Sequence, residues 1–204
     1  PRPISICGIN PTEGTLRVVY RVAGEGTKEF SEMKAGDTLE VMGPLGNGFT
    51  MKNEKAIIIG GGIGIPPMLE LAKQLDAEKT VVLGYRTSTF LKEEFEEVCD
   101  VKIATEDGSQ GAKGTVIDAI EKYGVEGKVI YACGPMPMLK ALAAYAEEHG
   151  MEAQISLEER MACGIGACLG CICKSKTKDH HTNVNNTRIC KDGPVFDAKE
   201  VVFA

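Results

Sequence analysis

The chain has 204 residues, of which 43% are hydrophobic and 25% charged, and it carries a formal net charge of −6 with a pI near 5.2. On a prior of ~150 residues per domain, this is an ordinary globular composition for one large or two modest domains. The acidic balance argues against a nucleic-acid surface, which needs clustered Lys and Arg. The longest apolar run, residues 56–69, is glycine-rich and shorter than the ~20 residues of a membrane span.

No signal peptide opens the sequence, so we expect a reducing cytoplasm, where clustered cysteines bind metal more often than they form disulfides. The first residue is Pro1 rather than Met, and a strand-like segment follows almost at once. We therefore expect that an upstream segment is missing and that the first domain is incomplete.

Residues 1–50 form the first of three compositional zones and are predicted to be β-structure. Three short β-branched segments, 4–10, 15–23 and 37–43, are separated by Pro, Gly and Asp. They predict a small β-structured first domain.

Residues 51–150 alternate between short apolar runs and amphipathic segments. Strands are predicted at 56–60, 80–84, 101–105 and 128–134, and helices at 66–75, 91–98, 114–123 and 137–150. In the first helix, Met68, Leu71, Ala72 and Leu75 share one face. This alternation predicts βαβ units and a parallel sheet.

Residues 151–204 contain one predicted strand, 152–158, and then a loop rich in cysteine and glycine. Cys163, Cys168, Cys171 and Cys173 lie within eleven positions, and Cys190 follows. Between them, the polar stretch 177–187 contains His180 and His181, which we expect to be solvated.

The glycine loop "GGGIGIPPM" runs from a predicted strand into a predicted helix. Glycines here allow a backbone to approach a pyrophosphate, whose charge the helix N-terminus stabilises. The motif is G-x-G-x-x-P, formed by Gly62, Gly64 and Pro67, because proline replaces the third glycine of the usual fingerprint. A tight turn without a ligand is the alternative.

A second candidate segment, "CGPMPM", ends the strand at 128–134. In open α/β sheets ligands lie beyond the carboxyl ends of the strands, which would bring Cys133, Gly134 and Pro135 to the ligand of the glycine loop. Taken alone, Cys133 is more often a small buried residue.

The cysteine spacing is C-x4-C-x2-C for Cys163, Cys168 and Cys171, with Cys190 after eighteen intervening residues. This matches the plant-type spacing for a [2Fe–2S] cluster, and the intervening glycines leave room for backbone close to a cluster. A four-thiolate zinc site in a non-catalytic binding module is the alternative, although zinc sites usually use two C-x2-C pairs. Cys173 is expected to be a neighbour of the cluster rather than a ligand.

The two nucleotide motifs, G-x-G-x-x-P and C-G-P-x-x-M, resemble those of the ferredoxin–NADP reductase superfamily. The resemblance implies an antiparallel flavin-binding barrel ahead of the nucleotide domain. "RPIS" and "AGEGT" resemble its flavin elements, and "GPLGNGF" its barrel-closing segment. By this resemblance FAD would be held by Arg2, Pro3, Ile4, Ser5, Gly24, Gly26 and Thr27.

The stretches "LEERMACGIGACLGCICK" and "RICKDGPVFDAKEVVF" resemble the electron-transfer subunits of class 1B dihydroorotate dehydrogenases. This implies FAD, a [2Fe–2S] cluster and NAD, and an FMN-containing catalytic subunit as partner, in pyrimidine biosynthesis. The expected organisation is a partial FAD-binding barrel at 1–50, an NAD-binding α/β domain at 51–150 and a [2Fe–2S] domain at 151–204. The loop before Cys190 is longer than the family's.

Two alternatives stay open. The first is the small subunit of an electron-bifurcating or hydrogenase-linked NAD(P)H:ferredoxin oxidoreductase, in which one cluster cysteine is often Asp. The second concerns the nucleotide: Arg86, with Thr87 and Ser88, favours the 2′-phosphate of NADP, whereas the family resemblance favours NAD.

Overall fold

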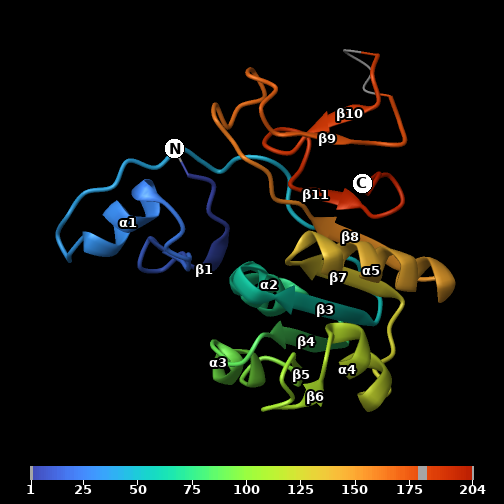
Figure 1. Cartoon of the computed structure of the whole chain (residues 1–204). Coiled ribbons are helices and arrows are strands. Elements are labelled where there is room, and N and C mark those ends of the chain that lie inside the picture. Colours follow the sequence, from blue (N-terminus) through green and yellow to red (C-terminus); the bar gives the residue numbers. More distant parts are fainter. Residues whose placement is uncertain (1, 179–182, 204) are drawn as a thin grey trace.

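The fold is described from a computed structural model, covering residues 2–178 and 183–203. Three parts follow one another along the chain, and Figure 1 shows them from blue to red. A small N-terminal part lies beside a seven-stranded sheet with helices on both faces. The cysteine loop lies beyond one edge of that sheet (Figure 1).

The N-terminal part contains an antiparallel pair of strands, β1 (Ile6–Asn10) and β2 (Thr15–Val18), and one helix, α1 (Glu25–Glu32). Thr27 explains where α1 begins, because its hydroxyl oxygen accepts hydrogen bonds from the backbone N–H groups of Ala23 and Gly24. The strand predicted at 37–43 is wrong: that segment has no regular secondary structure and pairs with no strand among the described residues. The described part of residues 1–50 therefore does not form a closed barrel.

The central part follows the predicted alternation. Its strands are β3 (Ala56–Gly61), β4 (Lys79–Tyr85), β5 (Asp100–Thr105), β6 (Ala112–Lys113) and β7 (Val129–Cys133). Its helices are a 3₁₀ turn (Gly62–Gly64), α2 (Ile65–Gln74), α3 (Lys92–Glu96), α4 (Val116–Tyr123) and α5 (Met136–Glu148). Helix α3 is shorter than predicted, and β6 was not predicted.

The strand order of the sheet is β11-β8-β7-β3-β4-β5-β6, in which only β11 pairs antiparallel with its neighbour. The outer strands β8 (Glu152–Ser156) and β11 (Val195–Asp197) both come from the third part of the chain. The parallel sheet thus extends beyond the predicted boundary at residue 150. The third part also contains an unpredicted pair, β9 (Ile172–Lys174) and β10 (Asn186–Arg188).

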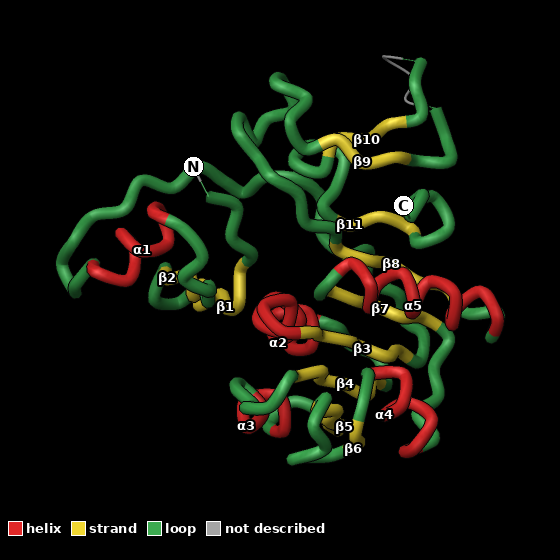
Figure 2. Tube along the Cα trace, in the orientation of Figure 1, coloured by secondary structure: helices red, strands yellow, loops and turns green. Residues whose placement is uncertain are grey.

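Two hydrophobic cores hold the layers together. Helices α2 and α3 cover one face of the sheet, where Met68, Leu69 and Phe95 are fully buried, and α4 and α5 cover the other (Figure 2). The continuous buried run Ile57–Ile58–Ile59 contributes side chains to both cores, because successive side chains of a strand point to opposite faces of the sheet.

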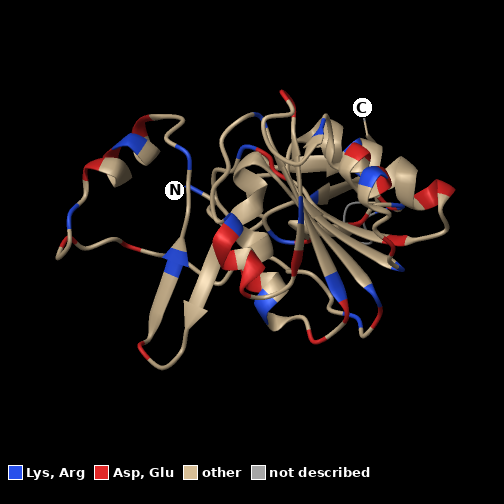
Figure 3. Ribbon diagram, turned by 90° about the horizontal axis from the view of Figure 1, so that it is seen from below, with Lys and Arg blue, Asp and Glu red and all other residues tan. Residues whose placement is uncertain are grey.

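Charged side chains are spread over the outside of these layers. Lys and Arg are interspersed with Asp and Glu along the helices and strand ends (Figure 3). Among the described helices, none is long and apolar enough to cross a membrane.

Candidate functional site

The glycine loop and the C-G-P turn lie against each other, as the sequence predicts. Strands β3 and β7 are parallel neighbours, with Gly60 opposite Cys133. A Cβ on Gly64 would lie 2.3 Å from the carbonyl oxygen of Cys133 and 2.6 Å from the backbone nitrogen of Gly134. Two backbone turns at the carboxyl end of the sheet are therefore in direct contact, and only glycine permits this approach.

Gly62 has a different surrounding from Gly64. Its φ is +52°, and a Cβ there would meet nothing within 4 Å. The backbone is therefore exposed at this point, directly before the N-terminus of α2, where Pro66 and Pro67 occupy the first turn. Open space next to a helix N-terminus suits a pyrophosphate.

Cys133 lies between β7 and the C-G-P turn. Burial raises the pKa of its thiol to about 11, and a hydrogen bond with Ser156 opposes part of that rise. The side chain is therefore a neutral thiol at neutral pH, suited to lining a ligand pocket. Pro135 follows as the N-cap residue of α5.

The two predicted flavin elements also come together, although they are more than twenty residues apart. A Cβ on Gly26 would lie 2.8 Å from Nε of Arg2, so the guanidinium packs directly on the backbone of the first turn of α1. Gly24 is the N-cap of this helix and Thr27 closes its capping box. Pro3, Ile4 and Ser5 follow Arg2 in the segment that leads into β1.

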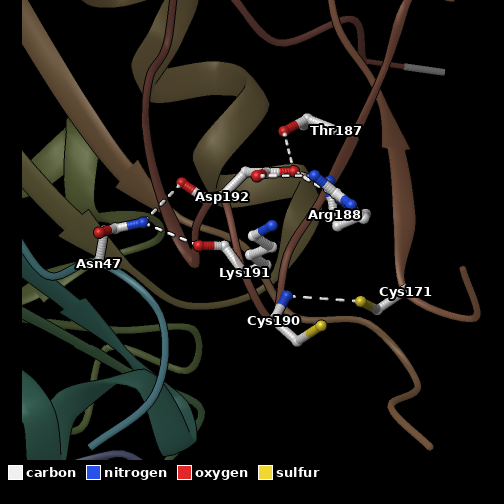
Figure 4. Close-up of polar contacts among 7 residues, drawn as sticks. All are labelled: Asn47, Cys171, Thr187, Arg188, Cys190, Lys191 and Asp192. Carbon is white, nitrogen blue, oxygen red and sulfur yellow. Dashed lines mark hydrogen bonds and ion pairs between the residues drawn. The ribbon is translucent and has the colours of Figure 1, made fainter. Parts of the chain in front are cut away.

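The four predicted cluster cysteines are free thiols that form two neighbouring pairs. The backbone N–H of Cys168 donates to Sγ of Cys163, and the backbone N–H of Cys190 donates to Sγ of Cys171, each over 3.4 Å. A third backbone donor, on Gly170, points at Sγ of Cys168 over 3.4 Å. Figure 4 shows the contact between Cys171 and Cys190.

The electrostatic environment differs between the two ends of this group. Backbone N–H donors, chiefly that of Cys168, lower the pKa of Cys163 to about 6. Burial and a hydrogen bond with Cys171 raise the pKa of Cys190 to about 11, and the negative charge of Cys163 acts in the same direction. The thiol of Cys163 is therefore ionised more readily than that of Cys190.

The spacing of these cysteines favours a [2Fe–2S] cluster over a zinc ion. A zinc site needs four sulfurs at about 2.3 Å from one ion. Within residues 2–178 and 183–203, no three or more His, Cys, Asp or Glu side chains are grouped to hold a single metal ion. The C-x4-C-x2-C spacing of Cys163, Cys168 and Cys171 matches a [2Fe–2S] cluster rather than the two C-x2-C pairs of a zinc site. Backbone N–H groups that point at sulfur are the outer-shell donors such a cluster uses.

Cys173 lies in β9 opposite Thr187, with burial raising the pKa of its thiol to about 11. It is half-buried and packs against the sheet's hydrophobic core. His180 and His181, predicted to be solvated, lie outside the described residues.

The sequence did not predict two sets of contacts that hold the turn around Cys190. Arg188 and Asp192 form an ion pair around Cys190, with 3.0 Å between Nε and Oδ2. Asn47 binds the turn that follows Cys190. Of these contacts, only the ion pair joins residues close in sequence, so only Arg188 and Asp192 offered a local signal.

Comparison with known proteins agrees with this geometry. The profile described as the iron–sulfur cluster binding domain of dihydroorotate dehydrogenase B matches residues 158–202, and that of an oxidoreductase NAD-binding domain matches 58–144. The electron transfer subunit of dihydroorotate dehydrogenase B (NAD(+)) from Caldanaerobacter subterraneus is 47% identical over 99% of this chain and 81% of its own length. The same subunit from Geobacillus kaustophilus is 45% identical over 99% of this chain and 80% of its own.

A solved structure of an NADH-dependent reduced ferredoxin–NADP oxidoreductase, studied for flavin-based electron bifurcation, is also similar. It is 33% identical, with a TM-score of 0.87, and the match covers 99% of this chain and 74% of that one. Similarity at this level extends over every part of the fold described above. The identity to the curated relatives, over nearly the whole of this chain, shows that the chain belongs to the family of electron transfer subunits of NAD-dependent dihydroorotate dehydrogenase B.

Proposed function

We propose that this electron transfer subunit passes single electrons through a [2Fe–2S] cluster bound by Cys163, Cys168, Cys171 and Cys190. The observation that carries the proposal is the arrangement of these thiols in two pairs, each with a backbone N–H directed at a sulfur. Two pairs of thiolates satisfy two irons, and N–H donors stabilise the more negative, reduced form of a cluster.

The nucleotide end of the subunit is proposed to bind NAD. Gly62 would leave room for the pyrophosphate at the N-terminus of α2, with Gly64 and Pro67 shaping the turn. Cys133, Gly134 and Pro135 would line the nicotinamide side, since their turn touches the glycine loop.

The N-terminal part is proposed to bind FAD as a section of an antiparallel barrel. Support comes from the β1–β2 pair and from the contact of Arg2 with Gly26, which brings a guanidinium to a helix N-terminus beside Gly24 and Thr27. Such a combination suits the flavin's pyrophosphate. Pro3, Ile4 and Ser5 would line the isoalloxazine ring.

When bound, FAD exchanges a hydride with the nicotinamide and single electrons with the cluster. The chain's own contribution is to orient these groups. Glycine turns hold the dinucleotide, Arg2 neutralises phosphate, and the neutral thiol of Cys133 leaves the nicotinamide site without an added charge.

The partner is proposed to be an FMN-containing dihydroorotate dehydrogenase catalytic subunit, working in pyrimidine biosynthesis in the cytoplasm. The curated relatives are electron transfer subunits of that enzyme. Exposed apolar side chains lie in the cysteine loop and beside it: Ile165 is 59% and Leu169 50% exposed within the loop, and Met42, next to Gly164, is 56% exposed. An apolar surface around an electron-transfer site suits a protein interface.

Co-expression with such a catalytic subunit tests the whole proposal. The complex should be yellow-brown, contain FAD and a reducible [2Fe–2S] cluster, and reduce NAD with dihydroorotate. A colourless protein that contains zinc would contradict the cofactor assignment.

The second candidate is a subunit of an electron-bifurcating NAD(P)H:ferredoxin oxidoreductase, and the structural similarity to the reductase described above favours it. The presence of cysteine at all four ligand positions argues against it, because that group often replaces one with Asp. Turnover with ferredoxin, and none with dihydroorotate, would identify this candidate as correct.

A further inference from the structure

One segment of the N-terminal part contacts both loops that carry cluster cysteines. At one end, Met42 and Leu45 approach Gly164, where an added Cβ would lie 3.3 and 3.4 Å from their terminal carbons. At the other end, a Cβ on Gly46 would lie 2.4 Å from the carbonyl oxygen of Gly193. We call residues 42–47 the bridging segment; Figure 1 shows this part of the chain passing beside the cysteine loop on its way to β3.

Asn47 makes the polar contacts of the bridging segment. Its side-chain Nδ2 donates to the carbonyl oxygens of Lys191, at 2.9 Å, and Asp192, at 3.2 Å (Figure 4). Its backbone N–H donates to the carbonyl of Gly193 at 2.6 Å, and its carbonyl accepts from the N–H of Val195 at 3.4 Å. Four hydrogen bonds therefore join one residue to four of the five positions that follow Cys190.

The same turn is held from inside by Asp192. Its carboxylate accepts from the backbone N–H of Arg188 at 2.9 Å and from Nε of that side chain at 3.0 Å (Figure 4). Cys190 lies in the middle of this turn, and its own N–H points at Sγ of Cys171. A shift of the turn would therefore move a ligand and an N–H···S contact together.

We propose that Asn47 is a positioning residue for the iron–sulfur cluster, coupling the flavin-side segment to the turn that presents Cys190. The inference rests on the proposed cluster. Asn47 itself lies outside the matched iron–sulfur domain, 144 positions before Lys191. The NH₂ group of its amide donates to two carbonyl oxygens. A carboxylate of the same shape has no hydrogen to donate to them.

The test compares isosteric and matched control variants of the full complex. Asn47→Asp keeps the shape but directs an acceptor at two carbonyl oxygens, and Asn47→Ala removes the donors without adding charge. Asn53→Ala is the control, because Asn53 is exposed in the same connecting segment and makes no hydrogen bond to the described chain. Measurements are the EPR spectrum of the reduced cluster, its midpoint potential, the loss of cluster absorbance to an iron chelator, and flavin reduction by NADH.

We expect Asn47→Asp to shift the EPR g values, make the cluster potential more negative and speed chelation about tenfold, because outer-shell partners affect metal affinity by that order. Asn47→Ala should change the same readouts less, and Asn53→Ala should match wild type. Flavin reduction by NADH should be unchanged in all three. The inference would be overturned if both Asn47 variants had the EPR spectrum and the chelation rate of the wild type. It would also be overturned if the Asn47 variants lost bound flavin and cluster to the same extent. A wild-type complex without a [2Fe–2S] signal would instead overturn the proposed function, and with it this inference.

Discussion

Arg17 and Glu94 form a two-pronged ion pair across 77 positions of the chain. Nη1 lies 2.5 Å from Oε2 and Nη2 lies 3.0 Å from Oε1, which joins β2 to α3. Nearby, the backbone N–H of Ile9 donates to Oε2 of Glu70 in α2 at 3.1 Å. The hairpin of the proposed flavin part is thus attached to the nucleotide part by two carboxylates.

Removing this ion pair should weaken the attachment modestly. The side chains are 49% and 35% exposed, so after solvent screening we expect Arg17→Ala to lower the free energy of unfolding by ~0.5 kcal/mol at neutral pH and low salt. High salt should reduce the difference from wild type. Arg21→Ala, at an exposed position without an ion pair to the described chain, is the control.

The pH dependence of that difference follows from Glu94. The hydrogen bond from Arg17 holds the pKa of Glu94 below its usual value, so folding favours the ionised carboxylate. This stabilisation is complete above the unfolded pKa and is lost as the pH falls through the lower folded value. Denaturant titrations should therefore converge for wild type and Arg17→Ala in acid. A constant difference down to the acid limit would contradict this account.

The central sheet was predictable from sequence because its strands are local apolar runs buried on both faces. The segment 37–43 has a similar pattern but forms no strand, because pairing depends on a neighbour that no local pattern specifies; Leu39 and Val41 stay exposed. Helix α1 was missed because "GEGT" is typical of a turn, although Thr27 closes the capping box of the helix from its third position. The proposed cluster cysteines are recognisable from their spacing, whereas Asn47 is not, since its partners are distant in sequence.

Cysteine substitutions should separate ligands from the neighbouring thiol. Cys173→Ser should keep a rhombic [2Fe–2S] EPR signal after reduction, because Cys173 lies in β9 and takes no part in the two thiol pairs. Serine at Cys163, Cys168, Cys171 or Cys190 should remove or strongly shift that signal. A lost signal in Cys173→Ser with a normal one in Cys190→Ser would require a different ligand set.

We expect the protein to prefer NADH to NADPH, although the exposed Arg86 could bind the 2′-phosphate of NADPH. The next loop places an acidic group nearby: Ser109 Oγ lies 2.7 Å from Oδ1 of Asp107 and 3.5 Å from the carbonyl oxygen of Thr87. Hydrogen bonds from the backbone N–H and hydroxyl of Ser109 lower the pKa of Asp107, so its charge persists and would repel a 2′-phosphate.

Stopped-flow reduction of the flavin by NADH and NADPH measures this preference. Asp107→Asn should raise the rate with NADPH several-fold relative to NADH, and Arg86→Ala should leave the NADH rate near wild type. A wild-type protein that prefers NADPH, and loses that preference in Arg86→Ala, would show that Arg86 rather than Asp107 selects the nucleotide.

The contact between the glycine loop and the C-G-P turn can be tested with one methyl group. Gly64 has a φ of −79°, which alanine adopts without strain, so Gly64→Ala tests only the clash of its Cβ with the Cys133 carbonyl, 2.3 Å away. Separating the turns should weaken NADH binding about tenfold, since overpacking costs ~1–3 kcal/mol and 1.4 kcal/mol is a factor of ten. The matched control is Gly48→Ala, because a Cβ on Gly48 would meet no atom within 4 Å.

The [2Fe–2S] EPR signal should be unchanged in both variants, because the cysteine loop lies beyond the β11 edge of the sheet. Wild-type NADH affinity in Gly64→Ala, with an unchanged melting temperature, would mean that the two turns do not need this contact to bind the dinucleotide.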